Sequence, residues 1–408
     1  MNCRHCGVLL EHLFLDLGNM PPSNAYLSSA QLQVAEPVYP LRVYVCDHCW
    51  LVQAEDFSHC DELFTSDYAY FSSVSESWLK HASDYYQMIS ERLMLDADSM
   101  VVEIASNDGY LLKNFVAAGI PCLGIEPTDS TADAAEKLGV PVVRQFFGEV
   151  LADELCEAGK RADLIIGNNV FAHVPDINDF TRGMTRLLKP EGTITLEFPH
   201  LKNLVELNQF DTVYHEHYSY LSLYAVISIL ESAGLKAYDV EQLPTHGGSL
   251  RVYASHSDSS HSVTGVVSNL LDDERKAGLQ DMDTYRAMQP RVEKIRADLL
   301  SFLQKQKVAG KLVAAYGAAA KGNTLLNFAG VTTKQLPFVC DAAPSKQGKF
   351  MPGSHIPILH PDHIAEARPD YLLILPWNIR DEITNHQRQI TAWGGRFVVA
   401  VPELEIFA

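Results

Sequence analysis

The sequence predicts an α/β protein with parallel sheets, and two observations indicate this class. Apolar runs of strand length at 100–105, 121–125, 164–167 and 192–197 are separated by helical stretches. A similar alternation starts again at 311 and continues toward the end of the chain. Strands that alternate with helices form a parallel sheet with helices on both faces, and such sheets bind ligands at the carboxyl ends of their strands.

The segment before the α/β region carries two Cys-x-x-Cys pairs. Cys3 and Cys6 form one pair, and Cys46 and Cys49 form the other. Four thiolates complete the tetrahedral shell of a structural zinc ion and leave no coordination position open. Two unrelated reduced pairs or a redox role are the alternatives, but no thioredoxin-like turn surrounds either pair. The remaining cysteines show no pairing pattern and are expected to be ordinary thiols: Cys60, Cys122, Cys156 and Cys340.

Composition limits the classes of function. The 408 residues suffice for two or three domains, and their net charge of −19 argues against non-specific nucleic-acid binding. A phosphate-bearing small molecule stays compatible, because helix N-termini can hold phosphate locally. No apolar run reaches the roughly 18 residues of a membrane span, and the first residues lack the apolar core of a signal peptide. We therefore expect a cytoplasmic protein, monomeric or weakly dimeric, with no membrane or nucleic-acid partner.

The turn after the first strand narrows the choice of cofactor. The strand at 100–105 leads into Ser-Asn-Asp-Gly at 106–109, and a helix is expected at 110–118. Glu126 ends the second strand, about 20 residues further on, where a carboxylate accepts the two hydroxyls of a ribose. That position fits either a dinucleotide or S-adenosylmethionine. The turn, however, lacks the Gly-x-Gly-x-x-Gly pattern that cradles a pyrophosphate.

The stretch Glu-Ile-Ala-Ser-Asn-Asp-Gly at 103–109 resembles the first motif of class I S-adenosylmethionine-dependent methyltransferases, and the turn and strand at 188–197 resemble the same fold. One departure is Ala105, where that motif usually has glycine, so this side chain is expected to crowd the cofactor slightly. The resemblance implies a Rossmann-like core. It also implies these cofactor-binding residues: Glu103, Ala105, Asn107, Asp108, Gly109, Glu126 and Asn168.

Downstream of this core, the run Tyr214-His215-Glu216-His217-Tyr218 gathers three titratable groups and two phenols. Such groups are costly to bury unless they pair or act chemically, and a histidine beside a carboxylate is suited to proton transfer near neutral pH. If the run is extended, both histidines lie on one face and the other three residues on the opposite face. Periodicity therefore does not choose between His215 and His217 as a base.

The last part of the chain predicts a second, smaller α/β unit. A strand at 244–253 is expected to close the first sheet, and a charged segment and long helix then run to about residue 308. The next strand, at 311–316, leads into a Gly317 turn and a helix. Lys321 lies one turn into that helix, where it could help to hold a pyrophosphate; a solvated lysine beside tight packing is the alternative. The later strands are expected at 338–341, 371–375 and 396–401.

The order of these motifs along the chain is specific. The cysteine pairs, the 103–109 motif, Tyr-His-Glu-His-Tyr-Ser-Tyr at 214–220 and Tyr-Gly-Ala-Ala-Ala-Lys-Gly-Asn at 316–323 together resemble the sugar C-methyltransferases that act on nucleotide-linked 4-keto-6-deoxyhexoses. The resemblance covers nearly the whole chain. It implies a zinc-binding N-terminal domain, a class I methyltransferase core and a C-terminal Rossmann-like domain that helps to hold the nucleotide sugar, with these bounds: 1–74, 75–255 and 256–408.

The same resemblance implies roles for individual residues. His217 is the expected base at the sugar carbon beside the ketone, which is carbon 3, and Glu216 and Tyr214 position or polarise the sugar around it. His215 is then a bystander. The resemblance, and the helix N-terminus after Gly317 as a phosphate site, lead us to expect these substrate contacts: Tyr68, Asn169, His173, Lys321 and Asn323.

We therefore predict a zinc-containing, S-adenosylmethionine-dependent C-methyltransferase of a nucleotide-linked 4-keto-deoxyhexose, active in branched-sugar biosynthesis. A carbon acceptor must lose a proton before it attacks, and the titratable run at 214–218 suits that need. The alternatives are an O- or N-methyltransferase on a similar substrate, an NAD(P)-dependent oxidoreductase and a non-catalytic adaptor. The missing pyrophosphate motif counts against the oxidoreductase, and the dense titratable run counts against the adaptor.

Overall fold

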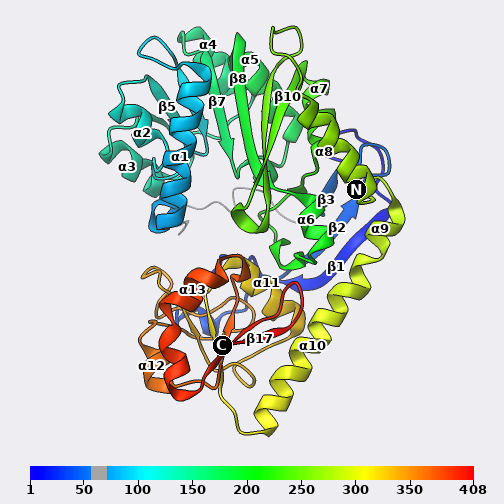
Figure 1. Cartoon of the computed structure of the whole chain (residues 1–408), viewed down its shortest axis with the longest axis vertical. Helices are drawn as coiled ribbons and strands as arrows, with labels where there is room; N and C mark the ends of the chain where they lie inside the picture. Colours follow the sequence, from blue (N-terminus) through cyan, green and yellow to red (C-terminus); the bar gives the residue numbers. More distant parts are fainter. Residues whose placement is uncertain (57–70) are drawn as a thin grey trace.

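The computed structural model describes residues 1–56 and 71–408, whose strands form three sheets (Figure 1). Tyr68 and Cys60 lie outside the described residues, so what was expected of them stays a prediction. The strands are β1 His12–Met20, β2 Tyr39–Val45, β3 Val52–Ala54, β4 Val101–Ile104, β5 Cys122–Ile125, β6 Val142–Val143, β7 Ala162–Asn168, β8 Leu188–Pro199, β9 Ser219–Tyr220, β10 Leu235–Leu243, β11 Ser249–His256, β12 Val313–Tyr316, β13 Val339–Cys340, β14 Ile358–Leu359, β15 Tyr371–Ile374, β16 Arg396–Val399 and β17 Glu405–Phe407.

Helices cover these sheets and connect their strands. The α-helices are α1 Glu76–Leu93, α2 Leu112–Ala117, α3 Asp129–Lys137, α4 Glu149–Glu157, α5 Ile177–Leu187, α6 Leu201–Glu206, α7 Leu223–Ser232, α8 Gly265–Lys276, α9 Met282–Arg286, α10 Met288–Val308, α11 Ala320–Ala329, α12 His363–Ala367 and α13 Arg380–His386. Short 3-10 turns are η1 Gln31–Gln33, η3 Ser72–Val74, η4 Phe171–His173, η5 Phe210–Thr212, η6 Thr245–Gly247, η7 Trp377–Ile379 and η8 Arg388–Trp393.

The middle sheet has the order β10-β11-β8-β7-β4-β5-β6, with β8 to β6 parallel and the β10–β11 hairpin antiparallel. Its central strands are buried on both faces, and for this reason they read as continuous apolar runs. One core cluster packs α1, α2 and α3 against one face, and a second packs α4, α5, α7 and α8 against the other. This is the Rossmann-like arrangement expected of a class I methyltransferase core.

The N-terminal sheet includes one strand, β9, that is distant in sequence from its other three strands. Its order is β1-β2-β3-β9, so that β9, which directly follows the 214–218 run, pairs with β3 of the cysteine-bearing segment. The pairing joins Val52 to Tyr220 and Gln53 to Ser219, and Ala54 N donates to the carbonyl of Tyr218 at 3.0 Å. The predicted zinc module therefore supports the predicted catalytic run directly.

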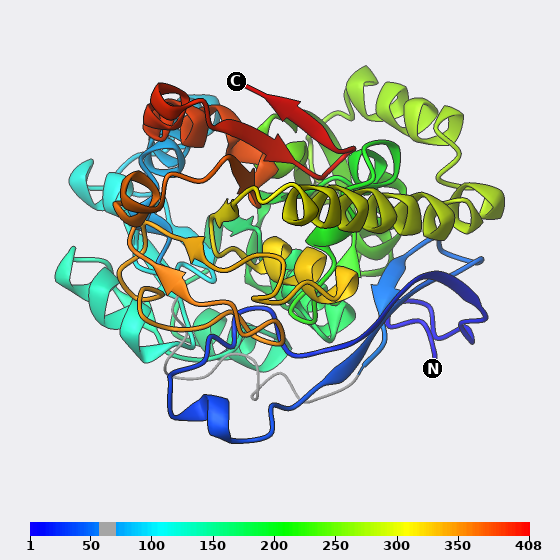
Figure 2. The same cartoon turned by 90° about the horizontal axis from the view of Figure 1, so that it is seen from below.

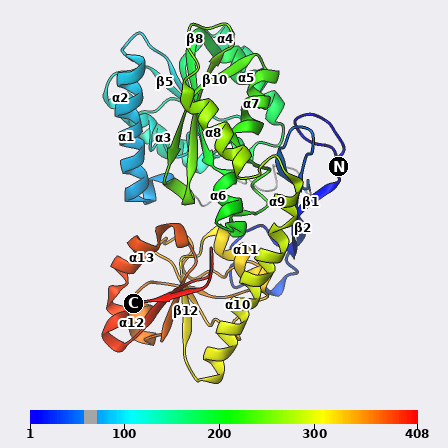
Figure 3. The same ribbon diagram turned by 45° about the vertical axis from the view of Figure 1, so that its right-hand side comes forward.

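The C-terminal sheet has the order β14-β13-β12-β15-β16-β17, parallel except for β17. One hydrophobic core is shared by this sheet, by α10 and α11, and by the N-terminal sheet. Figure 3 shows α10 running alongside the C-terminal sheet toward the N-terminal strands. Leu27 and Phe350 also exchange backbone hydrogen bonds, and Figure 2 shows the N-terminal segment (blue) following one side of the C-terminal unit.

One expected strand needs correction. The strand predicted at 244–253 begins only at Ser249, because Thr245–Gly247 forms the turn η6 with left-handed backbone at His246, Gly247 and Gly248. The long helix predicted to end near residue 308 is confirmed as α10, which ends at Val308 and is preceded by the shorter helices α8 and α9. Across the described residues, no helix combines the length and apolar character that crossing a membrane requires.

Candidate functional site

The turn after β4 forms the floor of the candidate cofactor site. Ala105, Asn107 and Gly109 have φ values of +58°, +50° and +75°, all in the left-handed region. An L-alanine in this conformation costs about 1–2 kcal/mol, so Ala105 keeps the backbone path that glycine would take, at some expense in stability. Gly109 has a further reason to be glycine, since a Cβ there would lie 3.0 Å from the Cβ of Ala135.

Three carboxylates crowd this floor. Glu103, Asp108 and Glu126 are each at most 5% exposed. Burial raises the pKa of Glu103 well above its usual value, and the charges of Asp108 and Glu126 add to the shift. A cationic ligand relieves such crowding, and S-adenosylmethionine carries both a sulfonium and an ammonium group.

Unpartnered oxygens mark the same place. Among the described residues, Glu103 Oε2, Asp108 Oδ1 and Asn168 Oδ1 are buried and have no hydrogen-bond partner. Buried polar atoms are rarely left in this state, so donors from a ligand fit here. Glu126 has partners already: its two oxygens accept the backbone N–H groups of Asn107 (3.0 Å) and Thr128 (2.9 Å), and their remaining lone pairs could accept ribose hydroxyls.

Two polar side chains of the turn also hold η3, the short 3-10 turn that precedes α1. Asn107 Oδ1 accepts the backbone N–H of Ser72 at 2.9 Å, and Asp108 Oδ2 accepts that of Ser73 at 3.0 Å. The predicted cofactor residues thus position the chain that returns from the N-terminal segment. The local sequence motif does not indicate this second, structural role.

The 214–218 run is not extended. His217 N donates to the carbonyl of Tyr214 at 2.9 Å, which closes a β-turn with His215 and Glu216 at its corner. The alternation that an extended run would have produced therefore does not apply. The turn gives the two histidines different surroundings, which a strand would not do.

His217 has the hydrogen bonding of a base. Its Nδ1 lies 2.9 Å from the carbonyl oxygen of Thr212, so Nδ1 carries the proton and Nε2 keeps a lone pair. Its ring centroid is 4.0 Å from that of Tyr214 and 4.6 Å from that of His173. Burial lowers the pKa of His217 well below 6.5, and the neighbouring His173 and Lys321 act in the same direction.

His215 lies instead against the N-terminal sheet. It is 1% exposed, and its ring centroid is 6.1 Å from that of Tyr39. Burial lowers the pKa of His215 to about 4, although the carbonyls of Pro40 and Tyr39 favour its protonated form. The neighbouring Glu216 is also held by the N-terminal segment, because its Oε1 accepts from Asn24 Nδ2 at 2.7 Å.

Asn169 and His173 follow β7, and His173 lies beside this turn, since its ring centroid is 4.6 Å from that of His217. Asn169 has a left-handed backbone (φ +54°), and its N–H donates to the carbonyl of Glu197 at 2.7 Å. Burial lowers the pKa of His173 to about 4, against the effect of a hydrogen bond to the carbonyl of Glu216. The structure therefore brings His173, Glu216 and His217 together, as the sequence implies.

The two C-terminal candidates have different surroundings. Lys321 Nζ donates to Asn378 Oδ1 at 2.6 Å and lies 4.6 Å from the ring centroid of Trp377. Burial lowers the pKa of Lys321 to about 8, with the charge of Asp211 opposing the shift. Asn323 has no exposed surface, and its Nδ2 donates to the carbonyl of Ser23 at 2.7 Å. This hydrogen bond joins two distant parts of the chain, while Asn323 Oδ1 is buried and has no hydrogen-bond partner among the described residues.

Asp211 is a site residue that sequence reasoning missed. Its fully buried carboxylate accepts from Trp377 Nε1 at 2.8 Å. Burial raises its pKa to about 6, with the charge of Lys321 opposing the shift. It directly precedes Thr212, whose carbonyl orients His217, so it links the C-terminal unit to the candidate base. No local sequence pattern indicates the role of Asp211, because its partners lie in distant segments of the chain.

A second missed group surrounds Glu197 at the carboxyl end of β8. Its buried carboxylate accepts from His81 Nε2 at 2.9 Å, Arg251 at 3.0 Å and Thr245 Oγ1 at 3.2 Å. Burial acts to raise the pKa of Glu197, but His81 and Arg251 more than offset this effect and lower it. The only signal in the sequence is a glutamate within an apolar strand.

The four N-terminal cysteines fit a zinc ion. The sulfurs of Cys3, Cys6, Cys46 and Cys49 all lie within 4.8 Å of one another. Zn–S bonds of about 2.3 Å in a tetrahedron would separate the sulfurs by roughly 3.8 Å, so small adjustments suffice. Gln53 Nε2 donates to Cys3 Sγ at 3.2 Å, which is the kind of outer contact that orients a ligand.

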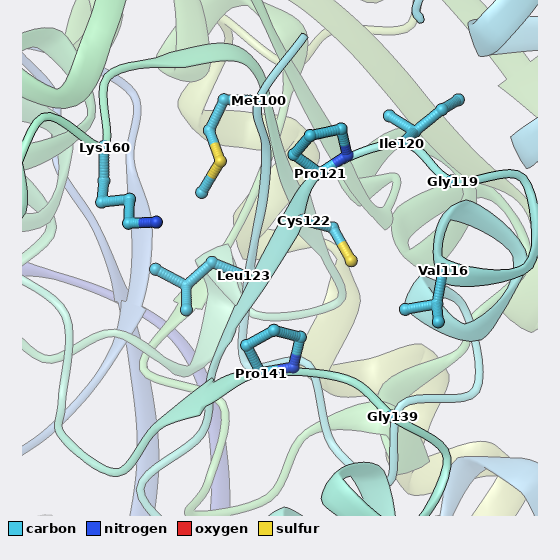
Figure 4. A pocket seen from close by; sticks show the side chains of 10 residues that line it. All are labelled: Met100, Val116, Gly119, Ile120, Pro121, Cys122, Leu123, Gly139, Pro141 and Lys160. Atoms are coloured by element: carbon cyan, nitrogen blue, oxygen red, sulfur yellow. The ribbon is translucent and has the colours of Figure 1, made fainter. Parts of the chain in front are cut away.

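Two hollows differ in their relation to this site. One of about 390 Å³ lies at the amino ends of β4 and β5, where Figure 4 shows Met100, Pro121 and Cys122. Parallel sheets bind ligands at the opposite ends of their strands, so this hollow is not the cofactor site. A narrow cavity of about 20 Å³ is lined by His217 and Thr212 among others, and it has room for about one water.

Known proteins resemble the chain along its full length. Family models match residues 3–64 (a zinc binding domain), 78–240 (a methyltransferase domain) and 244–402 (a C-methyltransferase C-terminal domain). The C-methyltransferase NovU of Streptomyces niveus is 36% identical over 409 residues, which cover 100% of this chain and 96% of NovU. The chain belongs to this C-methyltransferase family. It is therefore an S-adenosylmethionine-dependent C-methyltransferase with a zinc-binding domain.

Other matches cover smaller parts of this chain. A ubiquinone biosynthesis O-methyltransferase of Rhizobium etli is 30% identical over 98 residues, 23% of this chain and 38% of that enzyme. A solved methyltransferase structure from Thermotoga maritima is 17% identical with a TM-score of 0.35, over 48% of this chain and 98% of that one. Similarities of this size do not indicate the acceptor or the substrate of this C-methyltransferase.

Proposed function

We propose that this C-methyltransferase methylates carbon 3, beside the ketone, of a nucleotide-linked 4-keto-6-deoxyhexose, with His217 as the general base. One observation carries the proposal. The hydrogen bond from His217 Nδ1 to the carbonyl of Thr212 leaves Nε2 as a proton acceptor, beside His173 in the segment that follows the carboxyl end of β7.

The chemistry explains why a buried, neutral imidazole suits this task. A carbon beside a ketone is only weakly acidic, so its proton must pass to a base held in a fixed position. A base that is already protonated at neutral pH is useless, and the lowered pKa of His217 keeps its ring neutral. S-adenosylmethionine supplies the methyl group when bound. Tyr214 and Glu216 fix the turn around the base.

We assign the cofactor contacts to the turn after β4 and the ends of the neighbouring strands. Glu126 would accept the ribose hydroxyls, and the buried carboxylates of Glu103 and Asp108 would face the ammonium end. Asn168 would offer its unpartnered Oδ1 from the end of β7. Asn107 contributes backbone shape more than side-chain contact, since its Oδ1 already accepts from Ser72.

We assign the nucleotide sugar to the space shared by the 214–218 turn and the start of α11. Lys321 would provide a cation for the diphosphate, in a chain whose overall net charge is −19. Asn169 and His173 would contact the sugar, as would Tyr68. The division into domains of 1–74, 75–255 and 256–408 belongs to this proposal.

The product of methyl transfer tests this function. Purified protein would be incubated with S-adenosylmethionine labelled with carbon-13 on the methyl group and a panel of 4-keto-deoxyhexose nucleotides. We expect one product whose labelled methyl shows one-bond carbon–carbon coupling to sugar carbon 3 in the NMR spectrum. Attachment of the label to oxygen or nitrogen, or to a carbon not beside the ketone, would contradict the proposal.

A further inference from the structure

His246 carries an imidazole that has no role in the proposed function. It lies in the turn η6 between β10 and β11 with φ +54° and ψ +22°, a left-handed conformation that a residue other than glycine adopts at a cost of about 1–3 kcal/mol. Strain of this kind persists only where the surroundings impose it, and it gathers at functional sites.

The surroundings do impose this conformation. Gln209 Nε2 donates to the carbonyl of Gly247 at 2.8 Å, and Thr245 Oγ1 donates to the buried carboxylate of Glu197 at 3.2 Å. The ring of Trp377 packs so closely on Gly247 that a Cβ there would lie 2.5 Å from it. The turn is therefore fixed by β8, by the segment before the catalytic run and by the C-terminal unit.

The His246 ring itself is held only by packing. Its centroid lies 5.1 Å from that of Trp78, and within residues 1–56 and 71–408 neither ring nitrogen makes a hydrogen bond. Burial lowers its pKa to about 4; Lys321 and His81 favour the neutral ring, and Glu197 opposes them. The imidazole is therefore neutral at pH 7, with one N–H to donate.

His246 also shares the neighbourhood of the candidate base. Gln209, whose Nε2 donates to the carbonyl of Gly247 in the η6 turn, lines the same narrow cavity as His217. The carbonyl of Gln209 also accepts from Thr212 Oγ1 at 2.7 Å, and the carbonyl of Thr212 orients His217. A nitrogen donor and a nitrogen acceptor thus occur in the same small region, held by different loops. Removal of a proton beside a ketone requires both, because negative charge builds on the keto oxygen as the proton leaves.

We propose that His246 is a further catalytic residue that donates a hydrogen bond to the keto oxygen of the sugar; this inference rests on the proposed function. The C–H bond at carbon 3 breaks, and its proton goes to Nε2 of His217. The electron pair of that bond forms the carbon–carbon double bond, and the carbonyl π pair moves to oxygen. The N–H of His246 donates a hydrogen bond to this enolate oxygen. A neutral imidazole is a known type of donor to such an oxygen.

Variants at position 246 can remove the imidazole without disturbing the turn. Asparagine and glycine both tolerate left-handed backbone, so His246→Asn and His246→Gly should retain the fold. We would measure deuterium exchange from solvent into carbon 3 with S-adenosylhomocysteine present, and substrate affinity by calorimetry. We expect about 100-fold slower exchange, the usual loss for one oxyanion donor, with a Kd within threefold of wild type. Added imidazole should partly restore exchange in His246→Gly.

Three outcomes would overturn the role of His246. These are exchange at the wild-type rate in both variants, a loss of affinity that accounts for the whole effect, or no rescue by imidazole. A weakened Kd alone would place His246 on the diphosphate beside Lys321. If wild type methylates carbon 3 and the His246 variants exchange as fast as wild type, only this inference is refuted. If wild type neither exchanges nor methylates the substrate, the proposed function is refuted.

Discussion

Replacing His215 with glutamine should remove a source of acid sensitivity and leave catalysis intact. His215 is 1% exposed, and burial lowers its pKa to about 4. In the unfolded chain its pKa returns to about 6.5, so the unfolded state takes up the proton first as the pH falls. The contribution to stability is complete above pH 6.5 and is lost as the pH drops toward 4. Between pH 7 and pH 5 the loss amounts to about 2 kcal/mol.

Urea denaturation followed by tryptophan fluorescence measures this difference. We expect the unfolding free energy of wild type to fall by about 2 kcal/mol more than that of His215→Gln between pH 7 and pH 5. His386→Gln, at the exposed end of α13, is the matched control and should behave as wild type. Parallel losses in wild type and His215→Gln would refute the reasoning. So would a large loss of methyl transfer in His215→Gln at pH 7.5.

Three further predictions concern the cofactor, the substrate and the metal. Glu126→Gln should weaken S-adenosylhomocysteine binding by roughly 10- to 100-fold in calorimetry, since hydrogen bonds to a charged acceptor are lost; unchanged affinity would contradict the ribose assignment. The KM for the nucleotide sugar should rise above pH 8, where Lys321 loses its charge at a pKa of about 8, and Lys321→Arg should flatten that rise. A KM independent of pH up to 9.5 would argue against a diphosphate contact. Cys46→Ser should lower the zinc content measured by atomic absorption and reduce methyl transfer with it, because β3 supports β9; full activity without zinc would refute this coupling.

The sequence predicted most strands of the two α/β sheets because their burial on both faces leaves continuous apolar runs. The expected strand at 371–375 corresponds to β15, for example, and that at 164–167 to β7. The strand predicted at 244–253 failed at its start, because the Thr-His-Gly-Gly turn follows Pro244 and uses left-handed backbone that no periodicity encodes. The pairing of β9 with β3 was beyond prediction, since it joins segments far apart in the chain.

Some residues of the candidate site could be predicted from the sequence, and others could not. The turn after β4 could be predicted because its motif is contiguous, and so could the cysteine cluster. The difference between His215 and His217 could not be derived from spacing, because it depends on a β-turn and on the carbonyl of Thr212. Asp211 and Trp377 are 166 residues apart, and only the folded chain reveals their contact.

Deuterium exchange into carbon 3 of the keto sugar, with S-adenosylhomocysteine bound, tests the central claim most directly. His217→Asn and His215→Asn make a matched pair, since the same substitution is made at two buried histidines of one turn. The account predicts wild-type exchange in His215→Asn and a loss of about 100-fold or more in His217→Asn, with cofactor binding unchanged in both. Undiminished exchange in His217→Asn, or its loss in His215→Asn alone, would contradict the assignment of His217 as the base.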